Sequence, residues 1–402
     1  MNTDAARERW AAIGVIAALW AMVFSSSSQV MIMAPILPRI HDELDVSSAL
    51  SGLVVSGYAL ALSVTAVVIG PVSDRFGRRA MLLWGSGSMV VALALHVLAV
   101  DVGSLLAVRV LAGIAGGVLT GSAVSFIGDY FPYERRGWAN GWTMSGFAVG
   151  QVLGIPAGTL LAARHGFAAP FLLFAATMMI AFVLVLVIVP RGHRPRAAPL
   201  TLASGLAEYA TLLSSRRVRG AALVYATMFF AVSHFVVYLP TWAETDLDMG
   251  PRSIALMFTV GGVASVVFGP LAGKLSDRIG RRPLILASCI GAAVQLALTT
   301  VLVHGAITAS VMFFVAMILL AMRLSPLQAL LSTLVPDTRR GALMSLVVAL
   351  GQLGGALGAA LAGWLFTESG YAACTIVAAV AILTTGWIVW RELPEPSAAD
   401  RA

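Results

Sequence analysis

The chain has 402 residues, of which 59% are hydrophobic and only 11% are charged. A soluble domain has about a quarter of its residues charged, so this composition excludes an ordinary soluble protein. The net charge of +7 raises the question of nucleic-acid binding, but its distribution along the chain indicates membrane topology instead.

Long apolar segments follow one another along nearly the whole chain, separated by short polar turns. A helix needs about 20 mostly apolar residues to cross a membrane. A barrel would alternate apolar and polar residues in segments of about 10, and residues 180–190 show no alternation. We therefore predict an all-α membrane protein of twelve transmembrane helices. These helices are predicted near residues 11–34, 48–70, 80–100, 103–127, 137–163, 168–190, 219–241, 251–273, 283–303, 307–331, 341–365 and 370–390.

The basic residues fall mainly on one side of the predicted membrane. The two termini and the loops on their side hold 21 of the 26 Lys and Arg residues, while the opposite loops hold Arg39, Arg164 and Arg252. Arg109 and Arg323 lie within predicted helices. Because basic loops stay in the cytoplasm, we predict a multi-pass protein of the bacterial inner membrane with both termini cytoplasmic.

The longest polar connection follows Pro190 and begins Arg-Gly-His-Arg-Pro-Arg. We interpret it as a linker at residues 191–218, between an N-terminal six-helix bundle at residues 1–190 and a C-terminal six-helix bundle at residues 219–402. Thr201–Leu213 is predicted as a short helix on the membrane face.

The two halves contain repeated landmarks. Residues 70–79 recur at residues 273–282, and residues 132–137 recur at residues 336–341, at shifts of 203 and 204. At the same shift, Gly150 and Gly154 correspond to Gly354 and Gly358. Internal repeats of this kind are typical of transporters, in which the substrate path lies at the repeat interface.

Residues 70–79 and 273–282 share the pattern Gly-x-x-x-Asp-Arg-x-Gly-Arg-Arg. Both resemble the loop 2–3 signature of the major facilitator superfamily and its echo in loop 8–9, and the resemblance spans the whole chain. It implies a fold of two pseudo-symmetric six-helix bundles and a secondary active transporter, similar to the drug:proton antiporter branch. The chain has no phosphate-cradling Walker sequence, so no ATP drive is expected.

The repeated loops also predict a cytoplasmic gate. Asp74 lies at the C-terminal end of the second predicted helix, where the helix dipole disfavours an anion, so it needs a cationic or donor partner. The resemblance implies a network that joins the bundles and breaks during transport. The candidate gate residues are Asp74, Arg75, Arg78, Asp129, Asp277 and Arg278. For Arg79 and Arg282 a purely topological role is favoured.

Glycines at four-residue spacing mark the fourth and fifth predicted helices. Arg109 precedes Gly113, Gly117 and Gly121, a pattern that resembles a family motif tied to proton coupling. The alternative is an arginine that snorkels to the membrane surface. The fifth helix has Gly146, Gly150 and Gly154 followed by Pro156. It resembles only in part the antiporter motif Gly-Pro-x-x-Gly-Gly, so export is supported but open.

The resemblance implies a central cavity lined mostly by helices 1, 4, 7 and 10, and the polar residues in and near those helices are the binding candidates. The substrate-binding candidates are Gln29, Tyr58, Arg109, Gln151, His234, Tyr238, Arg323 and Gln328. Arg323 lies near a helix centre, where an isolated charge is costly, so it is expected to face the cavity. His234 and Arg109 are the proton-coupling candidates, although a lone histidine is more often a packing residue.

No Asp or Glu lies inside a predicted span, which argues against a buried carboxylate that binds cationic drugs. The histidines do not cluster at metal-ligand spacing. We predict a non-enzymatic exporter of a small organic molecule, monomeric, with protons and membrane lipids as partners and without cofactor, metal or nucleic acid. Two alternatives remain open: an importer or exchanger of an anionic or zwitterionic substrate that uses Arg109 and Arg323, and a lipid or lysolipid transporter.

Overall fold

The computed structural model describes residues 3–395 apart from residues 121, 123–125, 128–129, 190–201, 332–333 and 337–338. Every regular element in this described part is a helix. The elements are α1 Thr3–Met31, α2 Met33–Leu44, α3 Ser48–Phe76, α4 Arg78–Ala94, η1 Leu95–Leu98, α5 Val102–Leu119, α7 Tyr133–Val149, η2 Gly150–Gly154, α8 Ile155–His165, α9 Ala169–Ile188, α10 Leu202–Ser214, α11 Arg216–Val236, α12 Leu239–Thr245, α13 Pro251–Ile279, α14 Arg281–Leu302, α15 Ala306–Leu331 and α16 Arg340–Glu392.

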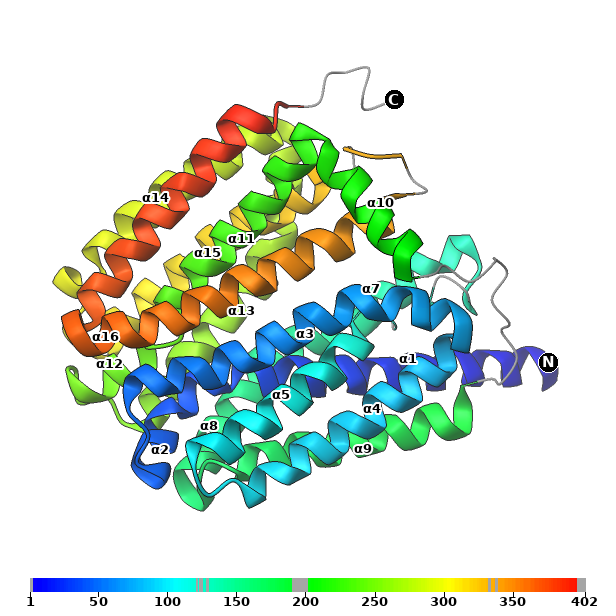
Figure 1. Ribbon diagram of the computed structural model, residues 1–402, viewed down its shortest axis with the longest axis horizontal. Helices are drawn as coiled ribbons and strands as arrows, with labels where there is room; N and C mark the ends of the chain where they lie inside the picture. Colours follow the sequence, from blue (N-terminus) through cyan, green and yellow to red (C-terminus); the bar gives the residue numbers. More distant parts are fainter. Residues whose placement is uncertain are drawn as a thin grey trace.

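Eleven helical segments in the described part are long and apolar enough to cross a membrane. One of them, α16, has 53 residues and contains Gly370 at φ 74° and ψ −178°, a conformation outside the helical region. The chain reverses direction within α16, between its orange and red parts (Figure 1). Because α16 therefore provides two passes, the described residues contain twelve segments of membrane-spanning length, the number that the sequence predicts.

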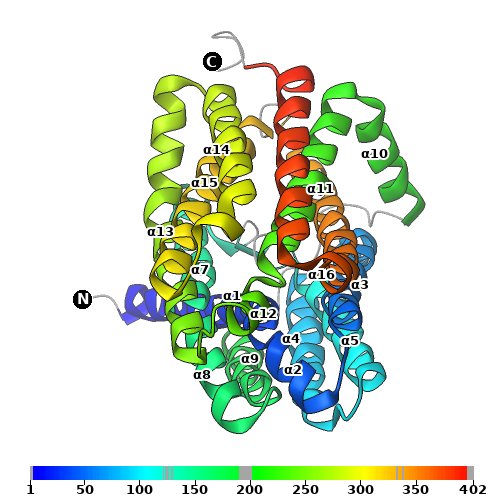
Figure 2. The same cartoon turned by 90° about the vertical axis from the view of Figure 1, so that its left-hand side faces the viewer.

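The helices form two groups that lie side by side (Figures 1 and 2). We call α1–α9 the N-terminal group and α11–α16 the C-terminal group. The start of α1, the end of α16 and the whole of α10 lie at one end of the molecule, and α2 and α12 lie at the other (Figure 1). We call these the terminal end and the hairpin end. The ribbons of α3 and α16 approach each other toward the hairpin end (Figure 1).

Contacts of α3 with α16, of α13 with η2 and α8, and of α2 with α12 join the groups. The Ser56 and Ser63 hydroxyls of α3 donate to the carbonyl oxygens of Ala356 and Ala349 in α16, at 2.6 and 3.1 Å. A side chain at Gly52 would overlap the Ala359 carbonyl oxygen, so α3 and α16 pack backbone to backbone here. On the other side, α13 packs against η2 and α8.

Within each group, the glycines at four-residue spacing lie on the helix face that contacts the neighbouring helix. A Cβ at Gly146 would lie 2.6 Å from the Trp20 carbonyl oxygen of α1. In the other group, a Cβ at Gly358 would lie 2.6 Å from the Phe230 carbonyl oxygen of α11. The two halves therefore use related glycines to pack the fifth helix on the first and the eleventh on the seventh, as close packing through small residues predicts.

The fifth predicted helix is interrupted. It runs as α7, then one π-helical turn, η2, and then α8. Pro156 follows this turn and has no N–H to donate, so the wider turn accommodates the missing hydrogen bond. The sequence predicts a bend here, and the π turn also places Gln151 at the junction of the two groups.

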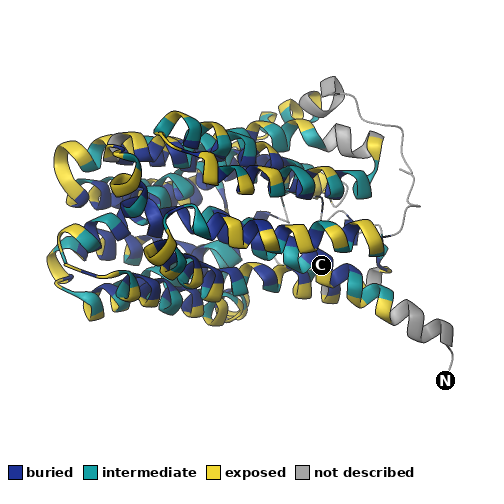
Figure 3. Cartoon of the chain, turned by 90° about the horizontal axis from the view of Figure 1, so that it is seen from below, coloured by how far each residue is buried: buried dark blue, intermediate teal, exposed yellow. Residues whose placement is uncertain are grey.

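Burial follows the membrane pattern. Buried residues lie between the helices, and exposed residues lie on the outer surface (Figure 3). Many of the exposed residues are large and apolar, such as Val187, Ile307 and Trp390, which are 75%, 81% and 60% exposed. Such a surface suits lipid and would aggregate in water.

Candidate functional site

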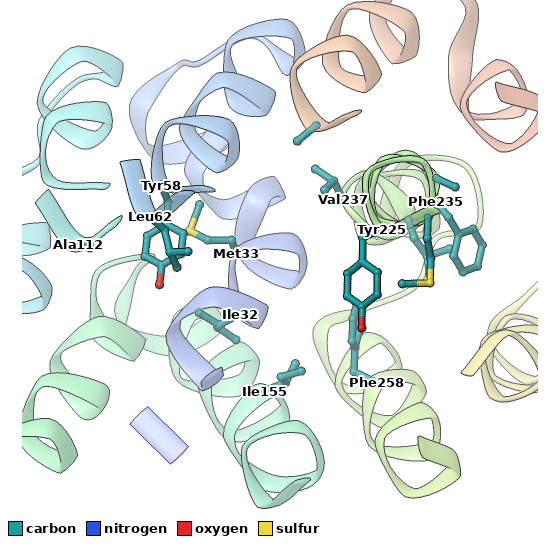
Figure 4. Close-up of a cluster of buried hydrophobic side chains, with 14 of the residues drawn as sticks. Ile32, Met33, Tyr58, Leu62, Ala112, Ile155, Tyr225, Phe235, Val237 and Phe258 are labelled. Carbon is teal, nitrogen blue, oxygen red and sulfur yellow. The ribbon is translucent and has the colours of Figure 1, made fainter. Parts of the chain in front are cut away.

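A cavity of about 440 Å³ lies between the two groups of helices. Met31, Phe147 and Ile155 line it from the N-terminal group, and α11, α13 and α15 line it from the C-terminal group. Figure 4 shows part of this junction, with Ile32 and Ile155 on one side and Tyr225 and Phe258 on the other. The volume is within the usual range for a small-molecule site, about 300–1,000 Å³.

The cavity wall is mostly apolar. Its polar side chains are those of Gln151, Ser265, Ser325 and Gln328, and none of its described lining residues is charged. Seven of the apolar side chains are aromatic or thioether groups. These are Phe147, Phe229, Phe258, Phe313, Met31, Met228 and Met317. Flexible methionines and aromatic rings can repack around ligands of different shapes.

Two of the eight predicted binding residues, Gln151 and Gln328, line this cavity. Three others, Gln29, Tyr58 and Arg109, come together inside the N-terminal group. The Arg109 Nη1 donates to Gln29 Oε1 at 2.9 Å, and the guanidinium lies 4.5 Å from the Tyr58 ring centroid. Arg109 is 1% exposed.

The Arg109 cluster contains several polar atoms without a protein partner. These atoms are Arg109 Nε, Gln29 Nε2 and His96 Nε2. His96 stacks on Phe171 at 3.8 Å between ring centroids, and the Arg109 guanidinium lies 5.9 Å from the same Phe171 ring. The cluster therefore holds a buried positive charge among neutral groups, and unpaired donors of this kind require internal water or a transient partner.

His234 and Tyr238 lie away from the central cavity. The His234 Nδ1 is 3.0 Å from the Phe230 carbonyl oxygen, and its Nε2 is buried without a partner. The Tyr238 hydroxyl lies beside Gly52 of α3, near the hairpin end. Tyr238 therefore contributes to the contact between the two groups.

Arg323 is buried in the C-terminal group at 3% exposure. It lines a separate small cavity within that group and is not among the residues that line the central cavity. Its neighbours Leu324 and Ser325 do line the central cavity. The sequence cannot distinguish these positions, because all three lie at the same depth in α15.

The predicted gate residues are only partly described. Asp129 and the side chains of Asp74 and Arg75 lie outside the described part of the structure. Asp277 Oδ1 lies 4.0 Å from Arg281 Nη2 of the same loop, and its side chain is exposed.

The related residues Arg79 and Arg282 close the ends of helices. Arg79 donates to the carbonyl oxygens of Leu186 and Val189 at the end of α9, at 2.9 and 2.8 Å. Arg282 donates to the Trp390 carbonyl oxygen near the end of α16. Both arginines therefore bind the C-terminal end of the last helix of their own group, where a cation is favoured.

Polar contacts at the two ends of the molecule escape prediction from sequence. At the hairpin end, Arg39 Nη2 binds Glu244 Oε1 at 3.2 Å and joins α2 to α12. At the terminal end, the Glu395 carboxylate accepts from the backbone N–H groups of Arg281 and Arg282 at 3.0 and 2.7 Å. A charged residue at the end of the molecule carries no signal of its partner in the sequence, so neither contact could be predicted.

The apolar cavity lining was also missed, although a signal exists. Phe258, Gly262, Ser265, Val266 and Gly269 recur at helical spacing along α13 and form one face of that helix. A search restricted to polar residues in helices 1, 4, 7 and 10 passes over this face.

The sequence matches the Major Facilitator Superfamily over residues 19–251 and 221–402. The chain belongs to this family, and it is therefore a multi-pass membrane transporter and not an enzyme.

Curated relatives are consistent with that membership. The MFS-type transporter YceJ of Bacillus subtilis is 26% identical over 357 residues, 87% of this chain and 88% of that protein. The multidrug resistance protein MdtG of Escherichia fergusonii is 29% identical over 280 residues, 67% and 68% of the two chains. MdtG of Proteus mirabilis is 25% identical over 386 residues, 93% and 95% of the two chains.

Solved structures share the fold. A D-xylose-proton symporter superposes with a TM-score of 0.74 at 19% identity, over 96% of this chain and 98% of that one. The inward open form of the xylose transporter XylE from E. coli gives 0.75 at 18% identity, over 96% and 97% of the chains. At this identity the likeness shows the fold alone.

Proposed function

We propose that the chain is a secondary active exporter of small neutral or amphipathic organic molecules, driven by the proton gradient. The observation that carries the proposal is the apolar cavity of about 440 Å³ between the two groups, with no charged residue in its described lining. A lipophilic molecule gains free energy by leaving water for such a site. The names of the MdtG relatives, multidrug resistance proteins, are consistent with this substrate class.

The proposal includes the topology predicted from the basic loops. The terminal end is cytoplasmic, and the hairpin end faces the periplasm across the bacterial inner membrane. Residues 1–190 and 219–402 are the two moving bundles, and residues 191–218 link them. With the hairpin end held by the Arg39–Glu244 contact and by the close packing at Gly52, the structure is assigned to the cytoplasm-facing state.

Proton coupling is assigned to Arg109, with His234 as the second candidate. Arg109 is buried, and none of its described contacts is a carboxylate. Arg109 Nε and Gln29 Nε2 have no protein partner, which leaves both N–H donors to internal water. His234 is the second candidate because a histidine side chain in water titrates near pH 6.5, in the range of a proton gradient.

The repeated loops are assigned to a cytoplasmic latch that closes in the opposite state. Asp74 and its neighbour Arg75 are the first pair of this latch, and Asp277 with Arg278 the second. Replacement of Asp74 by Asn is expected to lower transport while the protein stays folded. Unchanged transport would remove Asp74 from the latch.

The alternative of an anionic substrate loses its main support, because Arg109 and Arg323 do not line the central cavity. The lipid alternative keeps some support, because an acyl chain also suits an apolar wall. The experiment below therefore includes lysolipids and organic anions beside neutral compounds.

The test is ligand-dependent thermal stability of the detergent-purified protein, with a variant that fills the cavity. Gly269 lines the cavity, and no atom lies within 4 Å of a Cβ added there. Gly269→Leu therefore occupies ligand space without a clash at Cβ. A neutral lipophile at about 100 times its dissociation constant is expected to stabilise the parent by about 2.7 kcal/mol and the variant by much less.

The matched control is Gly141→Leu, because Gly141 also has no atom within 4 Å of an added Cβ and does not line the cavity. The neutral lipophile should stabilise Gly141→Leu as much as it stabilises the parent. If only organic anions stabilise the parent, the anionic-substrate alternative replaces the proposal. If only lysolipids do, the lipid alternative replaces it.

A further inference from the structure

A second, much smaller cavity lies inside the C-terminal group. Its volume is about 40 Å³. It lies directly behind the wall of the central cavity, because Val232, Val236, Met317 and Leu320 line both cavities. Apart from Arg323 and Gln295, the small cavity is lined by apolar side chains from α11, α14, α15 and α16.

Arg323 brings a positive charge to this cavity without a counter-ion from the protein. Its Nε and Nη1 are buried and have no hydrogen-bond acceptor. The neighbouring thiol of Cys289 is a weak acceptor. No carboxylate among the described side chains forms an ion pair with Arg323. The Gln295 side chain adds an amide donor to the lining, although its Nε2 already donates to the Met312 carbonyl oxygen at 3.2 Å.

A buried charge of this kind requires compensation. Removal of an ion from water costs several kcal/mol unless an opposite charge and hydrogen bonds replace the hydration. Water in the cavity would leave the charge unbalanced. An anion in the cavity would balance it.

The size of the cavity selects the anion. One water molecule requires about 10–15 Å³ of cavity volume. A cavity of 40 Å³ therefore holds about three waters, or one halide ion with a water. A carboxylate with a carbon chain exceeds this volume. We propose that the cavity beside Arg323 binds a single halide-sized anion, with chloride as its physiological ligand.

This inference does not depend on the proposed substrate or direction of transport. A bound chloride would neutralise Arg323 and stabilise the packing of α14 and α15 behind the substrate wall. It would act as a fixed structural ligand of the C-terminal group.

The test is the thermal unfolding midpoint of the purified parent in sodium chloride, sodium bromide and sodium gluconate at one ionic strength. Gluconate is too large for the cavity. Chloride and bromide are expected to raise the midpoint by about 3 °C or more over gluconate. An equal midpoint in all three salts would overturn the proposal.

The variant that removes the site is Arg323→Met, which is expected to lose the difference between halide and gluconate. Its matched control is Arg391→Met, which removes an arginine with a 53% exposed side chain at the end of α16. The control should keep the difference. If Arg323→Met keeps it as well, the halide acts elsewhere and the proposal fails.

If Arg323→Met does not fold, bromide locates the site in the parent. Crystals grown in sodium bromide are expected to show an anomalous peak beside the Arg323 guanidinium. Bromide peaks confined to the protein surface, with none at Arg323, would contradict the assignment.

Discussion

Arg109 and Arg323 are the two arginines that the sequence predicts inside the membrane spans, and their environments differ. Arg109 has an amide acceptor in Gln29 and an aromatic face in Tyr58. Arg323 has a thiol beside it and a small cavity at its side. Since neither lines the central cavity, each is expected to act on transport without direct contact with substrate.

Arg109→Gln is expected to separate binding from transport. Loss of the charge should reduce proton-driven transport about fivefold or more, a typical size for coupling between two sites. Ligand-dependent stabilisation should stay unchanged, because Arg109 does not contact the central cavity. Both quantities are measured on one preparation.

His234→Gln, tested in the same way, decides between the two coupling candidates. Arg109→Lys, which keeps the charge, should retain part of the transport. If Arg109→Gln removes ligand stabilisation as well, Arg109 acts on the substrate site and the coupling role is contradicted.

The depth of a polar residue in the membrane could be predicted from the sequence, but the direction of its side chain could not. Successive helical residues are rotated by about 100°, so residues two apart face opposite sides. Ala321 and Ser325 line the central cavity, and Arg323 between them points away. In the same way, Val232 and Val236 line the central cavity, and His234 between them does not. The rotation of each helix depends on its neighbours, which the sequence does not name.

At the scale of elements, glycine spacing was the most informative pattern. The helices that contain Gly146 and Gly358 approach the carbonyl oxygens of their partners so closely that a side chain has no room. The sequence predicts smooth helix faces here, and it also predicts the bend at Pro156. It does not predict that the bend is a π-helical turn with Gln151 at the cavity.

Gly354→Ala is expected to destabilise the C-terminal group. A Cβ at this position would overlap the carbonyl oxygen of Ala226, and because that neighbour is backbone the helices must separate. Overpacking of this kind costs about 1–3 kcal/mol. The measurement is the thermal midpoint of the purified variant.

Gly341→Ala in the same helix is the control, since no atom lies within 4 Å of an added Cβ there. Its midpoint should be unchanged or slightly higher, because alanine favours a helix by up to about 1 kcal/mol. Equal midpoints for Gly354→Ala and the parent would show that α11 and α16 are not held at this contact.

For the whole molecule, the fold and membership of the family could be predicted from composition, the repeated loops and the basic-residue bias. The contacts that hold the two groups together could not. Ser56, Ser63 and Gly52 make those contacts through backbone carbonyl oxygens, and every residue supplies a carbonyl. The pairing of Arg39 in α2 with Glu244 in α12 joins residues that are 205 positions apart in the sequence.

Arg39→Gln is expected to loosen the hairpin end and shift the molecule toward the opposite state. A partly exposed ion pair contributes about 0.2–1 kcal/mol, so the equilibrium should change by about 1.4- to 5-fold. The readout is labelling of Ser325→Cys, which lies in the central cavity, by an impermeant maleimide added from the hairpin side. The native cysteines Cys289 and Cys374 are buried, so their background should be low.

Arg252→Gln is the control, because it removes an exposed arginine next to the hairpin end, at the start of α13. Labelling should rise with Arg39→Gln and stay at the parent level with Arg252→Gln. If labelling of Arg39→Gln equals that of Arg252→Gln, the ion pair does not hold the hairpin end closed.

The most direct measurement of the central claim is transport in proteoliposomes with the terminal end facing outward and an acidic lumen. We predict that a neutral fluorescent lipophile accumulates inside, that the accumulation disappears when the pH gradient is collapsed, and that Gly269→Leu abolishes it while Gly141→Leu does not. Accumulation of an organic anion in place of the lipophile, or lipophile uptake equal with and without the gradient, would contradict the account.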